Sequence, residues 1–442
     1  MVKVITYGTF DLLHYGHIRL LERAKELGDY LIVGITADDF DKTRGKINVQ
    51  QSLSERIEAV RATNLADKII VEEYEGQKID DIKRYGIDIF TVGSDWEGKF
   101  DYLNDYCKVK YLERTKGISS SEIRAEKRAI SLGIVGDYAP FLNKFQSEDI
   151  YVNGIEITSI CTNNLSEMSE AIKKLPLVTH NYDELLNNVD AVYIKSNIEE
   201  HYEQIKKALL LNKHVLCESP ICLNEEECKE LFELAKEKNC ILMEAIRTAY
   251  STAYSRLLLL LKGGKIGKII SVDATCSSIK EVKDVSEINS LKDWGPTALL
   301  PIFQILGTEY EKKTIISNFA DSSNKNDCFT KINFIYEKAI GSIKVAEKAK
   351  SEGDLIITGT EGYLYVPAPW WKTDYFEIRF EDQSNNKRYF YQLDGEGIRH
   401  ELVSFVRSIQ ERKNLSNINE NESLAICKIM KDFENKKDLI EI

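Results

Sequence analysis

The sequence lacks the features of a secreted or membrane-spanning chain. It starts with MVKVITYGTFDLLHYGH, which has no basic segment followed by an apolar stretch and therefore no secretory signal. The longest apolar run, from Leu257 to Leu261, is far too short to cross a bilayer. We therefore predict a soluble protein of the cytoplasm with no membrane partner.

Cysteine pairs of the kind that bind zinc are also missing. Nine cysteines, an odd number, are scattered from Cys107 to Cys427 without a single C-x-x-C pair. The closest three, Cys217, Cys222 and Cys228, do not have the spacing of zinc ligands. This pattern predicts reduced thiols that serve as small apolar side chains, and no metal site formed by the protein.

Positive charge is scarce as well. The chain has 59 Lys and Arg against 71 Asp and Glu, a formal net charge of −12, and protonating all six histidines would only halve it. Such a chain repels phosphate backbones at long range, so we predict no nucleic-acid partner, although a local pocket for one nucleotide is compatible with this charge. With 442 residues, of which 43% are hydrophobic, the chain can form two or three domains, and wholesale disorder is excluded.

Two series of alternating strand and helix patterns follow one another along the chain. In residues 1–128, apolar strand patterns recur about every 30 residues with amphipathic helices between them, which is typical of a doubly wound parallel sheet. Ligands of such sheets bind beyond the carboxyl ends of the strands. A second series starts at residues 132–135, and after about residue 266 it changes to longer strand patterns with Gly and Pro turns, which indicate an open antiparallel sheet. We predict an α/β protein with a nucleotide-binding domain (1–128), a Rossmann-like domain (129–250) and an α+β domain (251–442).

The strongest chemical signal is the segment GTFDLLHYGH, from Gly8 to His17, between the first expected strand and the first expected helix. His14 and His17 are three residues apart near a helix start, so their imidazoles point toward one place, and Gly16 lets a phosphate approach the backbone. The free N–H groups at the helix terminus add partial positive charge. Together these features predict an anion site whose donors can follow a phosphate group into its transition state.

A second element, RTKGISSS from Arg114 to Ser121, follows the last expected strand of the first series and opens a helix. Hydroxyl groups at a helix start commonly cap its free N–H groups, and capping alone would account for the serines. Capping does not account for Arg114, whose guanidinium at the carboxyl edge of a parallel sheet suits phosphate binding. Paired with the first motif, this element is predicted to form the other wall of a triphosphate site.

With these two motifs and the segments IRLLERAKELGD (18–29) and GSDWEGKF (93–100), residues 1–128 resemble the glycerol-3-phosphate cytidylyltransferases of the HxGH nucleotidyltransferase superfamily. The resemblance implies transfer of CMP from CTP to glycerol phosphate or a related polyol phosphate, giving CDP-glycerol and pyrophosphate. It also implies Mg²⁺ bound mainly through the phosphates of CTP, a homo-oligomer (dimer or tetramer), and a product used for a surface polymer such as teichoic acid or capsule. The chain departs from the family at residues 119–121, which are Ser-Ser-Ser where Ser-Thr-Thr is usual, and at Gly45, which interrupts a lysine-rich loop.

The resemblance also implies roles for individual residues. The catalytic residues it implies are His14, His17, Arg114 and Lys46. The nucleotide-binding residues it implies are Thr9, Phe10, Gly16, Asp95, Arg114, Thr115, Gly117, Ile118, Ser119 and Ser120. Those implied for the substrate are Asp11, which would orient the first motif, Lys46, with Lys42 beside it, and Trp96. A core position for Trp96 and a solvent-exposed loop position for Lys46 stay open.

From about residue 129 the chain is similar, mainly in layout, to the Gfo/Idh/MocA oxidoreductases, which pair a Rossmann domain with a substrate domain on an open sheet. The landmarks are GIVG (133–136), CESP (217–220), EAIR (244–247), DWG (293–295), GTEG (359–362) and a terminal helix from His400.

The residues that make this fold a dehydrogenase depart from the family. The glycine fingerprint G-x-G-x-x-G has Tyr138 and Phe141 at its second and third glycine positions, and residues 161–164 (CTNN) offer no acid for the ribose. Ser219 stands where the family carries a lysine, and the helix after Asp293 lacks the histidine often used as proton donor. We predict a domain that kept the fold and lost the reaction, with a structural, oligomerising or regulatory role. Recognition of a sugar-like or phosphorylated ligand stays open as an alternative.

Two other interpretations stay open. In the first, the second half reduces a keto-phosphate such as dihydroxyacetone phosphate with NAD(P)H and supplies the alcohol phosphate to the first half, which would make the chain bifunctional. In the second, the chain is a non-enzymatic assembly protein, which requires both halves to be inactive and conflicts with the intact first motif. Glycerol-3-phosphate, glycerol-2-phosphate and longer polyol phosphates are not distinguished by the sequence.

Overall fold

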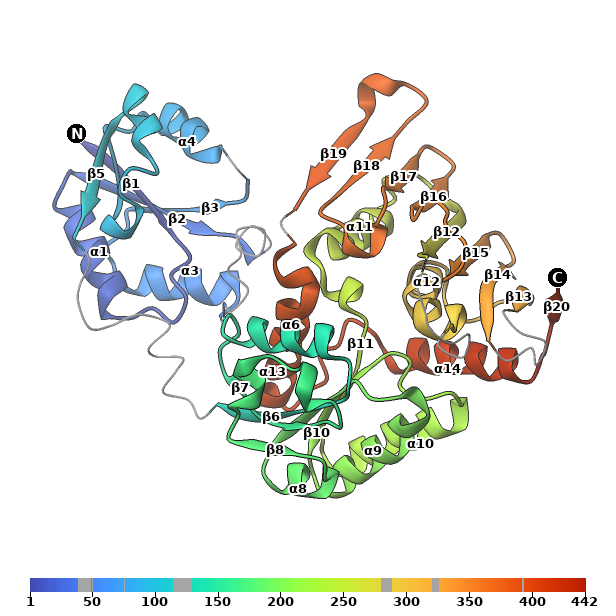
Figure 1. Ribbon diagram of the computed structural model, residues 1–442. Helices are drawn as coiled ribbons and strands as arrows, with labels where there is room; N and C mark the ends of the chain where they lie inside the picture. Colours follow the sequence, from blue (N-terminus) through green and yellow to red (C-terminus); the bar gives the residue numbers. More distant parts are fainter. Residues whose placement is uncertain are drawn as a thin grey trace. The chain divides into compact units, whose positions relative to one another are not determined.

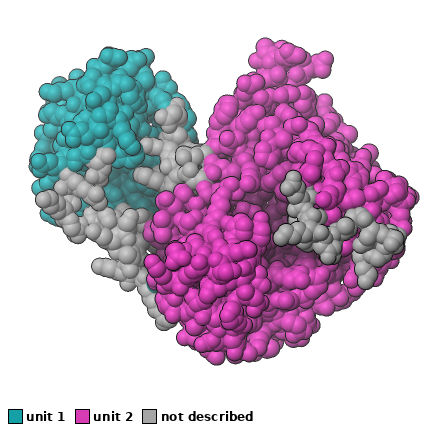
Figure 2. All heavy atoms as spheres, in the orientation of Figure 1, with its two compact units in different colours: residues 1–129 teal, residues 130–442 magenta. Residues whose placement is uncertain are grey.

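The computed structural model describes residues 1–38, 49, 51–74, 76–113, 129–279, 288–319, 326–391 and 393–442. The chain divides into two compact units, Met1–Ala129 (unit 1) and Ile130–Ile442 (unit 2), which are coloured separately in Figure 2. The predicted α/β fold class is confirmed in both units. The further division of unit 2 near residue 250 stays a prediction.

Unit 1 is built on a parallel sheet whose described strands have the order β3-β2-β1-β4-β5 (Figure 1). The strands are β1 (Lys3–Gly8), β2 (Tyr30–Thr36), β3 (Lys68–Glu72), β4 (Ile89–Gly93) and β5 (Lys108–Leu112). The central strand β1 pairs with β2 on one side and with β4 on the other. The strand order therefore reverses between β1 and β4, and in open α/β sheets ligands bind beyond the carboxyl ends of the strands at this point.

Helices cover both faces of this sheet. On one face, α1 (Tyr15–Lys25) and α3 (Leu53–Ala62) pack their apolar sides on β1 and β2. On the other face lie α4 (Gln77–Tyr85) and the short helix η2 (Asp101–Asp105). Ser52 caps α3 in a capping box with Glu55. This arrangement leaves the carboxyl edge of the sheet to the loops that follow β1 and β4.

Unit 2 begins with a second parallel sheet, in which the described strands have the order β11-β10-β9-β6-β7-β8. The strands are β6 (Ile130–Val135), β7 (Ile155–Cys161), β8 (Leu177–Thr179), β9 (Ala191–Ile194), β10 (His214–Glu218) and β11 (Leu242–Ala245). One face is covered by α6 (Ala139–Asp149) and α7 (Glu170–Lys173), and the other by α8 (Tyr182–Asn187), α9 (Ile198–Leu210) and α10 (Glu225–Glu237).

The remaining strands of unit 2 form a mixed sheet with the described order β19-β18-β17-β16-β12-β15-β14-β13-β20. They are β12 (Ile269–Ser277), β13 (Lys312–Phe319), β14 (Asp327–Ile335), β15 (Ile340–Ala346), β16 (Leu355–Gly359), β17 (Tyr363–Val366), β18 (Tyr375–Arg379), β19 (Lys387–Phe390) and β20 (Leu439–Glu441). Most neighbours are antiparallel as predicted, but β12 pairs with β15, and β13 with β20, in parallel. The prediction missed these pairs because helices, α12 (Ser290–Leu306) among them, separate the paired strands along the chain and let the second strand return in the same direction.

The end of the chain returns to the second parallel sheet. Leu402 and Phe405 of α13 (Ile398–Glu411) belong to the same apolar core as Leu132 of β6, and Cys427 of α14 (Glu420–Glu434) belongs to the core beneath α9 and α10. The C-terminal helices therefore pack on the Rossmann-like part of unit 2. No helix within the described residues combines the length and the apolar character that a membrane crossing requires.

Candidate active site

The loop after β1 has an unusual backbone. Phe10 and Leu12 adopt left-handed conformations with φ of 54° and 49°, which cost free energy for residues with a side chain. The Phe10 ring is buried and folds back over Gly8, where an added Cβ would lie 3.0 Å from the ring. A loop with such backbone conformations is stable only where surrounding contacts hold it. It leads directly into α1.

His14 forms the N-cap of α1, with its ring accepting a hydrogen bond from the backbone. The Gly16 N–H donates to Nδ1 of His14 at 3.1 Å. A ring nitrogen that accepts carries no proton, so the proton of a neutral His14 ring lies on Nε2. The cap therefore fixes the tautomer, with the ring proton on Nε2.

His17 lies in the first turn of α1, directly against His14. The two rings are stacked, with centroids 3.8 Å apart and an angle of 21° between their planes, and both side chains are partly exposed. The Phe10 ring meets His17 edge-on at 5.5 Å. The structure thus brings both predicted histidines together at the start of a helix, where the partial positive charge of free N–H groups favours an anion.

Arg56 in α3 holds this loop in place, and the sequence reasoning missed it. Its side chain is fully buried, and its guanidinium donates to the carbonyls of Thr9 (2.6 Å), Thr36 (2.9 Å) and Gln51 (3.1 Å). It also forms an ion pair with Asp38. The signal in the sequence was weak: an arginine three residues after Leu53, on the otherwise apolar face of α3.

Asp11 ties the same loop to the segment that precedes α3. Its carboxylate, only 4% exposed, accepts from the Gln51 N–H at 3.0 Å, while the Leu12 N–H donates to Oε1 of Gln51 at 2.7 Å. The orienting role that the family resemblance implied for Asp11 stays a prediction.

Trp96 lies across the same edge, in the short helix η1 (Ser94–Trp96) that follows β4. It is partly exposed, its ring packs against Phe100 at 5.8 Å, and it borders a small cavity of about 40 Å³ beside Gly8. Trp96 is therefore both a packing residue and a neighbour of the loop after β1. Asp95 belongs to η1 as well, but its side chain lies outside the described residues.

A buried ion pair borders the same small cavity. Lys78 of α4 pairs with Glu72 at the end of β3, Thr36 donates to Glu72 at 3.0 Å, and Lys78 Nζ lies 4.7 Å from the centre of the Tyr7 ring. Tyr7 donates to Asp81 at 2.8 Å, and burial together with Asp81 raises the pKa of Tyr7, so the phenol keeps its proton. No sequence motif joins these residues, because the contacts form only when α4 packs on the sheet.

The remaining predicted site residues of unit 1 lie outside the described residues, and their roles stay predictions. They are Lys46 with its neighbour Lys42, and Arg114, Thr115, Gly117, Ile118, Ser119 and Ser120.

Unit 2 has a larger cavity of about 910 Å³ at the carboxyl edge of its parallel sheet. In Rossmann folds a dinucleotide lies against the loop that follows the first strand. Here that loop starts at Gly136, whose φ is 144° and where an added Cβ would lie 2.2 Å from the Lys195 carbonyl oxygen. Gly136 is therefore required by the protein's own packing.

The next two fingerprint positions do not fit a dinucleotide. Phe141 is only 8% exposed, stacks on Tyr193 at 6.0 Å and carries the Arg247 guanidinium 5.0 Å above its ring. Tyr138 is 61% exposed and projects a large side chain at the rim of the cavity. The close approach of a pyrophosphate to the backbone, for which the fingerprint needs glycine, is blocked at both positions.

In dinucleotide-binding Rossmann folds an acidic residue after the second strand binds the ribose. In this chain the loop at that position is bound to Asp137 instead. Asp137 accepts hydrogen bonds from Thr162 Oγ1 (2.9 Å) and from the Asn163 N–H (2.6 Å), in the loop after β7. This carboxylate ties the two loops together. The residues present therefore do not fit a nicotinamide dinucleotide.

A charged cluster remains in the cavity. Lys195 Nζ lies 3.5 Å from Glu218, and Tyr193 donates to the same carboxylate. Burial opposes the ionisation of Glu218, but Lys195 and Arg247 outweigh it and lower its pKa. Beneath them Glu401 is fully buried, neither of its oxygens has a hydrogen-bond partner among the described residues, and burial together with Glu218 raises its pKa.

Comparison with known proteins separates the same two regions. Residues 5–126 match the cytidylyltransferase-like family, and residues 131–246 match the oxidoreductase family with an NAD-binding Rossmann fold. The resemblance of each half, predicted from its motifs, is confirmed.

The relatives of the first region are close. The chain is 49% identical over 130 residues to glycerol-3-phosphate cytidylyltransferase of Bacillus spizizenii, a match that covers 29% of this chain and 100% of that protein. It is 52% identical over 126 residues to the Bacillus subtilis enzyme of the same name (28% and 97% covered) and 48% identical over 126 residues to the Staphylococcus aureus one (28% and 95%).

The solved structures similar to the second region are distant in sequence. A 3-ketoreductase from Actinomadura kijaniata, in complex with NADP and TDP-benzene, superposes with a TM-score of 0.62 at 17% identity, covering 71% of this chain and 100% of that one. Levoglucosan dehydrogenase, in complex with NADH and levoglucosan, gives a TM-score of 0.60 at 16% identity, with 70% and 97% covered. At such identities the similarity establishes the fold alone.

Proposed function

Because the chain belongs to the glycerol-3-phosphate cytidylyltransferase family through residues 5–126, we propose that unit 1 transfers CMP from CTP to glycerol phosphate. A phosphate oxygen of glycerol phosphate attacks the α-phosphorus of CTP. The bond from the α-phosphorus to the bridging oxygen breaks, and pyrophosphate leaves with that bond's electrons. The products are CDP-glycerol and pyrophosphate, and the reaction needs no nucleophile from the protein.

The observation that carries this proposal is the stacked pair of histidines at the end of the central strand. His14 offers Nε2–H because its Nδ1 is used by the Gly16 N–H, and His17 lies 3.8 Å away, ring to ring. Two donors and a helix N-terminus at one point suit the negative charge that develops on the phosphate oxygens as pyrophosphate departs. Fixed donors of this kind act without reorganising in the transition state.

Arg56 and Asp11 act as positioning residues in this proposal. Arg56 donates to the Thr9 carbonyl and Asp11 accepts from the Gln51 N–H, while the Gln51 side chain accepts from the Leu12 N–H. These contacts would keep the histidines at a fixed distance from the nucleotide. Trp96 would border the cytidine or the alcohol substrate from the β4 side.

The finer features of the reaction also belong to the proposal. Arg114 and Ser120 would hold the β- and γ-phosphates, Lys46 the alcohol phosphate, and Mg²⁺ would arrive with CTP, bound mainly by its phosphates. We place the activity in the synthesis of a surface polymer such as teichoic acid or capsule, and expect the active species to be a homo-oligomer.

For unit 2 we propose a role other than hydride transfer. Tyr138, Phe141 and the Asp137–Thr162 contact occupy the positions that a dinucleotide needs, so the bifunctional alternative has no support from these residues. A structural, oligomerising or regulatory role agrees with an intact fold whose dinucleotide site is filled by its own side chains.

One assay tests the proposal for unit 1. Pyrophosphate release is measured with CTP and a panel of glycerol-3-phosphate, glycerol-2-phosphate and longer polyol phosphates, with ATP as the nucleotide control. Release that requires CTP and one of these alcohols supports the proposal and identifies the substrate. Release with none of them contradicts it.

A further inference from the structure

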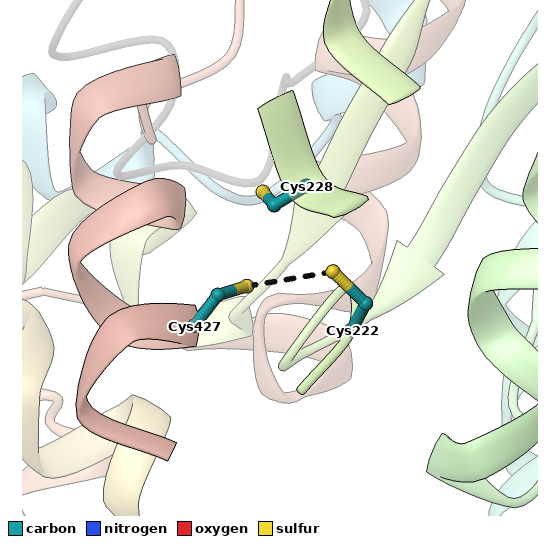
Figure 3. A group of neighbouring side chains, drawn as sticks. All are labelled: Cys222, Cys228 and Cys427. Carbon is teal, nitrogen blue, oxygen red and sulfur yellow. Dashed lines mark hydrogen bonds between the residues drawn. The ribbon is translucent and has the colours of Figure 1, made fainter. Parts of the chain in front are cut away.

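Three buried cysteines of unit 2 meet at one point although they lie far apart along the chain. Cys222 follows β10, Cys228 lies in the first turn of α10, and Cys427 lies in α14 (Figure 3). Their sulfur atoms all lie within 4.8 Å of one another, and those of Cys222 and Cys427 are 3.8 Å apart. All three side chains are buried, with at most 1% exposed.

These distances are those of a thiolate metal site. Zinc–sulfur bonds of about 2.3 Å place two sulfurs about 3.8 Å apart in a tetrahedral site and about 4.0 Å apart in a trigonal one. The Cys222–Cys427 pair already has this separation. The other two sulfur pairs would have to close by no more than about 1 Å, within the reach of small side-chain rotations.

The protons of the three thiols do not prevent metal binding. The thiolate is the form that binds metals, and a metal ion replaces the protons that thiols carry. The three neighbouring thiols are therefore a set of ligands that a metal can bind by displacing their protons to solvent.

We propose that Cys222, Cys228 and Cys427 form a binding site for one thiophilic metal ion of the class of Zn²⁺ and Cu⁺. Sulfur ligands select these ions over Mg²⁺ and Ca²⁺. Three sulfurs satisfy Cu⁺, and Zn²⁺ adds one oxygen ligand to reach its usual four.

No motif in the sequence indicates this site. Cys222 and Cys427 are 205 residues apart, and Cys222 and Cys228 lack the spacing of zinc ligands, so the third ligand is recruited only when α14 packs on α10. The expectation of no metal site in the chain is therefore replaced by this proposal.

The position of the ligands indicates a structural role for the metal. One ligand comes from the loop that leaves β10, one from α10 and one from the C-terminal helix α14, so a bound ion joins the Rossmann-like sheet to the end of the chain (Figure 3). Cys222 also follows Pro220 by two residues, and Pro220 lines the large cavity of unit 2. Metal occupancy would fix that part of the rim and stabilise the folded chain by mass action.

The test uses the full chain, purified under reducing conditions without chelator, and starts with its metal content by mass spectrometry. Metal-free protein is then titrated with Zn²⁺, with Cu⁺ under anaerobic conditions, and with Co²⁺, whose thiolate charge-transfer absorption reports sulfur ligands. We expect one equivalent to bind and the melting temperature to rise. C222S and C427S are each expected to weaken binding more than about tenfold, because one ligand of three is lost.

The matched control is C276S, a variant of another fully buried cysteine of unit 2 that lies outside the cluster. It is expected to bind like the wild type. Should C222S or C427S fail to fold, alkylation of the wild type in moderate urea, which lets the reagent reach buried thiols, serves instead. Bound Zn²⁺ should then protect Cys222, Cys228 and Cys427 but not the partly exposed Cys107 and Cys328.

Three results would overturn the proposal. The first is metal-free protein that takes up none of the three ions. The second is C222S or C427S binding as tightly as C276S, or, in the alkylation arm, no difference in protection with and without Zn²⁺. The third is a Cys222–Cys427 disulfide in protein that was kept reduced, which would assign the close sulfur pair to a crosslink.

Discussion

Both units begin in the same way, with a parallel strand, a loop and a helix, yet the two loops present opposite surfaces. In unit 1 the loop after β1 is held from behind by Arg56, and its histidines lie partly exposed at the start of α1. In unit 2 the loop after β6 carries Asp137, which binds the neighbouring loop, and the first turn of α6 carries Phe141, which is packed against Tyr193. One architecture therefore supports one site with two histidines at its helix start and one site filled by its own side chains. The chemistry of each unit therefore depends on the loops at the carboxyl edge of its parallel sheet, and the sheet itself does not determine it.

The largest effect is expected at the histidine pair. His17→Ala removes one fixed donor to the transition state and should lower turnover about a hundredfold, or by ~3 kcal/mol in activation free energy, with little change in melting temperature. Pyrophosphate release with CTP and glycerol-3-phosphate measures the rate. Tyr15→Phe is the matched control, because Tyr15 lies in the same turn and is 55% exposed. Equal turnover rates for His17→Ala and Tyr15→Phe would show that His17 does not stabilise the transition state. The loop of unit 1 would then have no catalytic role that sets it apart from the loop of unit 2.

The support behind the loop is tested next. Arg56→Met leaves the carbonyls of Thr9, Thr36 and Gln51 without their donor in a buried place, and should lower the free energy of unfolding of unit 1 by about 3 kcal/mol. Urea unfolding followed by fluorescence checks this value. Arg61→Met is the control on the same helix, where the exposed ion pair with Glu58 should contribute under about 1 kcal/mol. If Arg56→Met lowers the free energy of unfolding no more than Arg61→Met does, Arg56 does not support the loop after β1.

In unit 2 the buried carboxyl group of Glu244, near the carboxyl end of β11, makes the stability of the folded chain depend on pH. Burial raises the pKa of Glu244 from 4.5 to about 7. Folding therefore favours the protonated form, so this contribution to stability is complete below pH 4.5 and is lost as the pH rises to about 7 and beyond. The total change is about 3 kcal/mol.

Glu244→Gln should flatten this dependence in urea unfolding measured between pH 4.5 and 8. Glu237→Gln, at an exposed position of α10, should leave the slope unchanged. A Glu244 variant with the slope of the wild type would show that this carboxyl ionises as easily folded as unfolded.

The last and smallest expected effect concerns nicotinamide dinucleotides, which we expect not to bind. Calorimetric titration of the full chain with NADH or NADPH should give no saturable binding, because Tyr138 and Phe141 block the approach of the pyrophosphate. CTP in the same preparation is the positive control. Saturable binding of either dinucleotide would revive the bifunctional interpretation.

Much of the fold follows from local patterns in the sequence. The alternation of strands and helices predicted for residues 1–128 is present in β1 to β5 and the helices between them, and α3 begins after its cap residue Ser52. The position of His14 and His17 at a sheet edge also follows, because a strand followed at once by a helix places the intervening loop there. Local periodicity and capping carry this information.

Contacts between distant segments could not be predicted in this way. Arg56 lies on the apolar side of a short helix, and only the fold shows that three carbonyls from separate segments surround it. The parallel pairing of β12 with β15 and the meeting of Cys427 with Cys222 have the same origin. Such contacts depend on how elements pack, and a single sequence contains no periodic signal for them.

A crystal structure of the full chain with a non-hydrolysable CTP analogue tests the central claim most directly. The account predicts the triphosphate in unit 1, within hydrogen-bond distance of His14 Nε2 and of the His17 ring. Nucleotide bound in the cavity of unit 2, with the edge beside His14 and His17 vacant at saturating analogue, would contradict it.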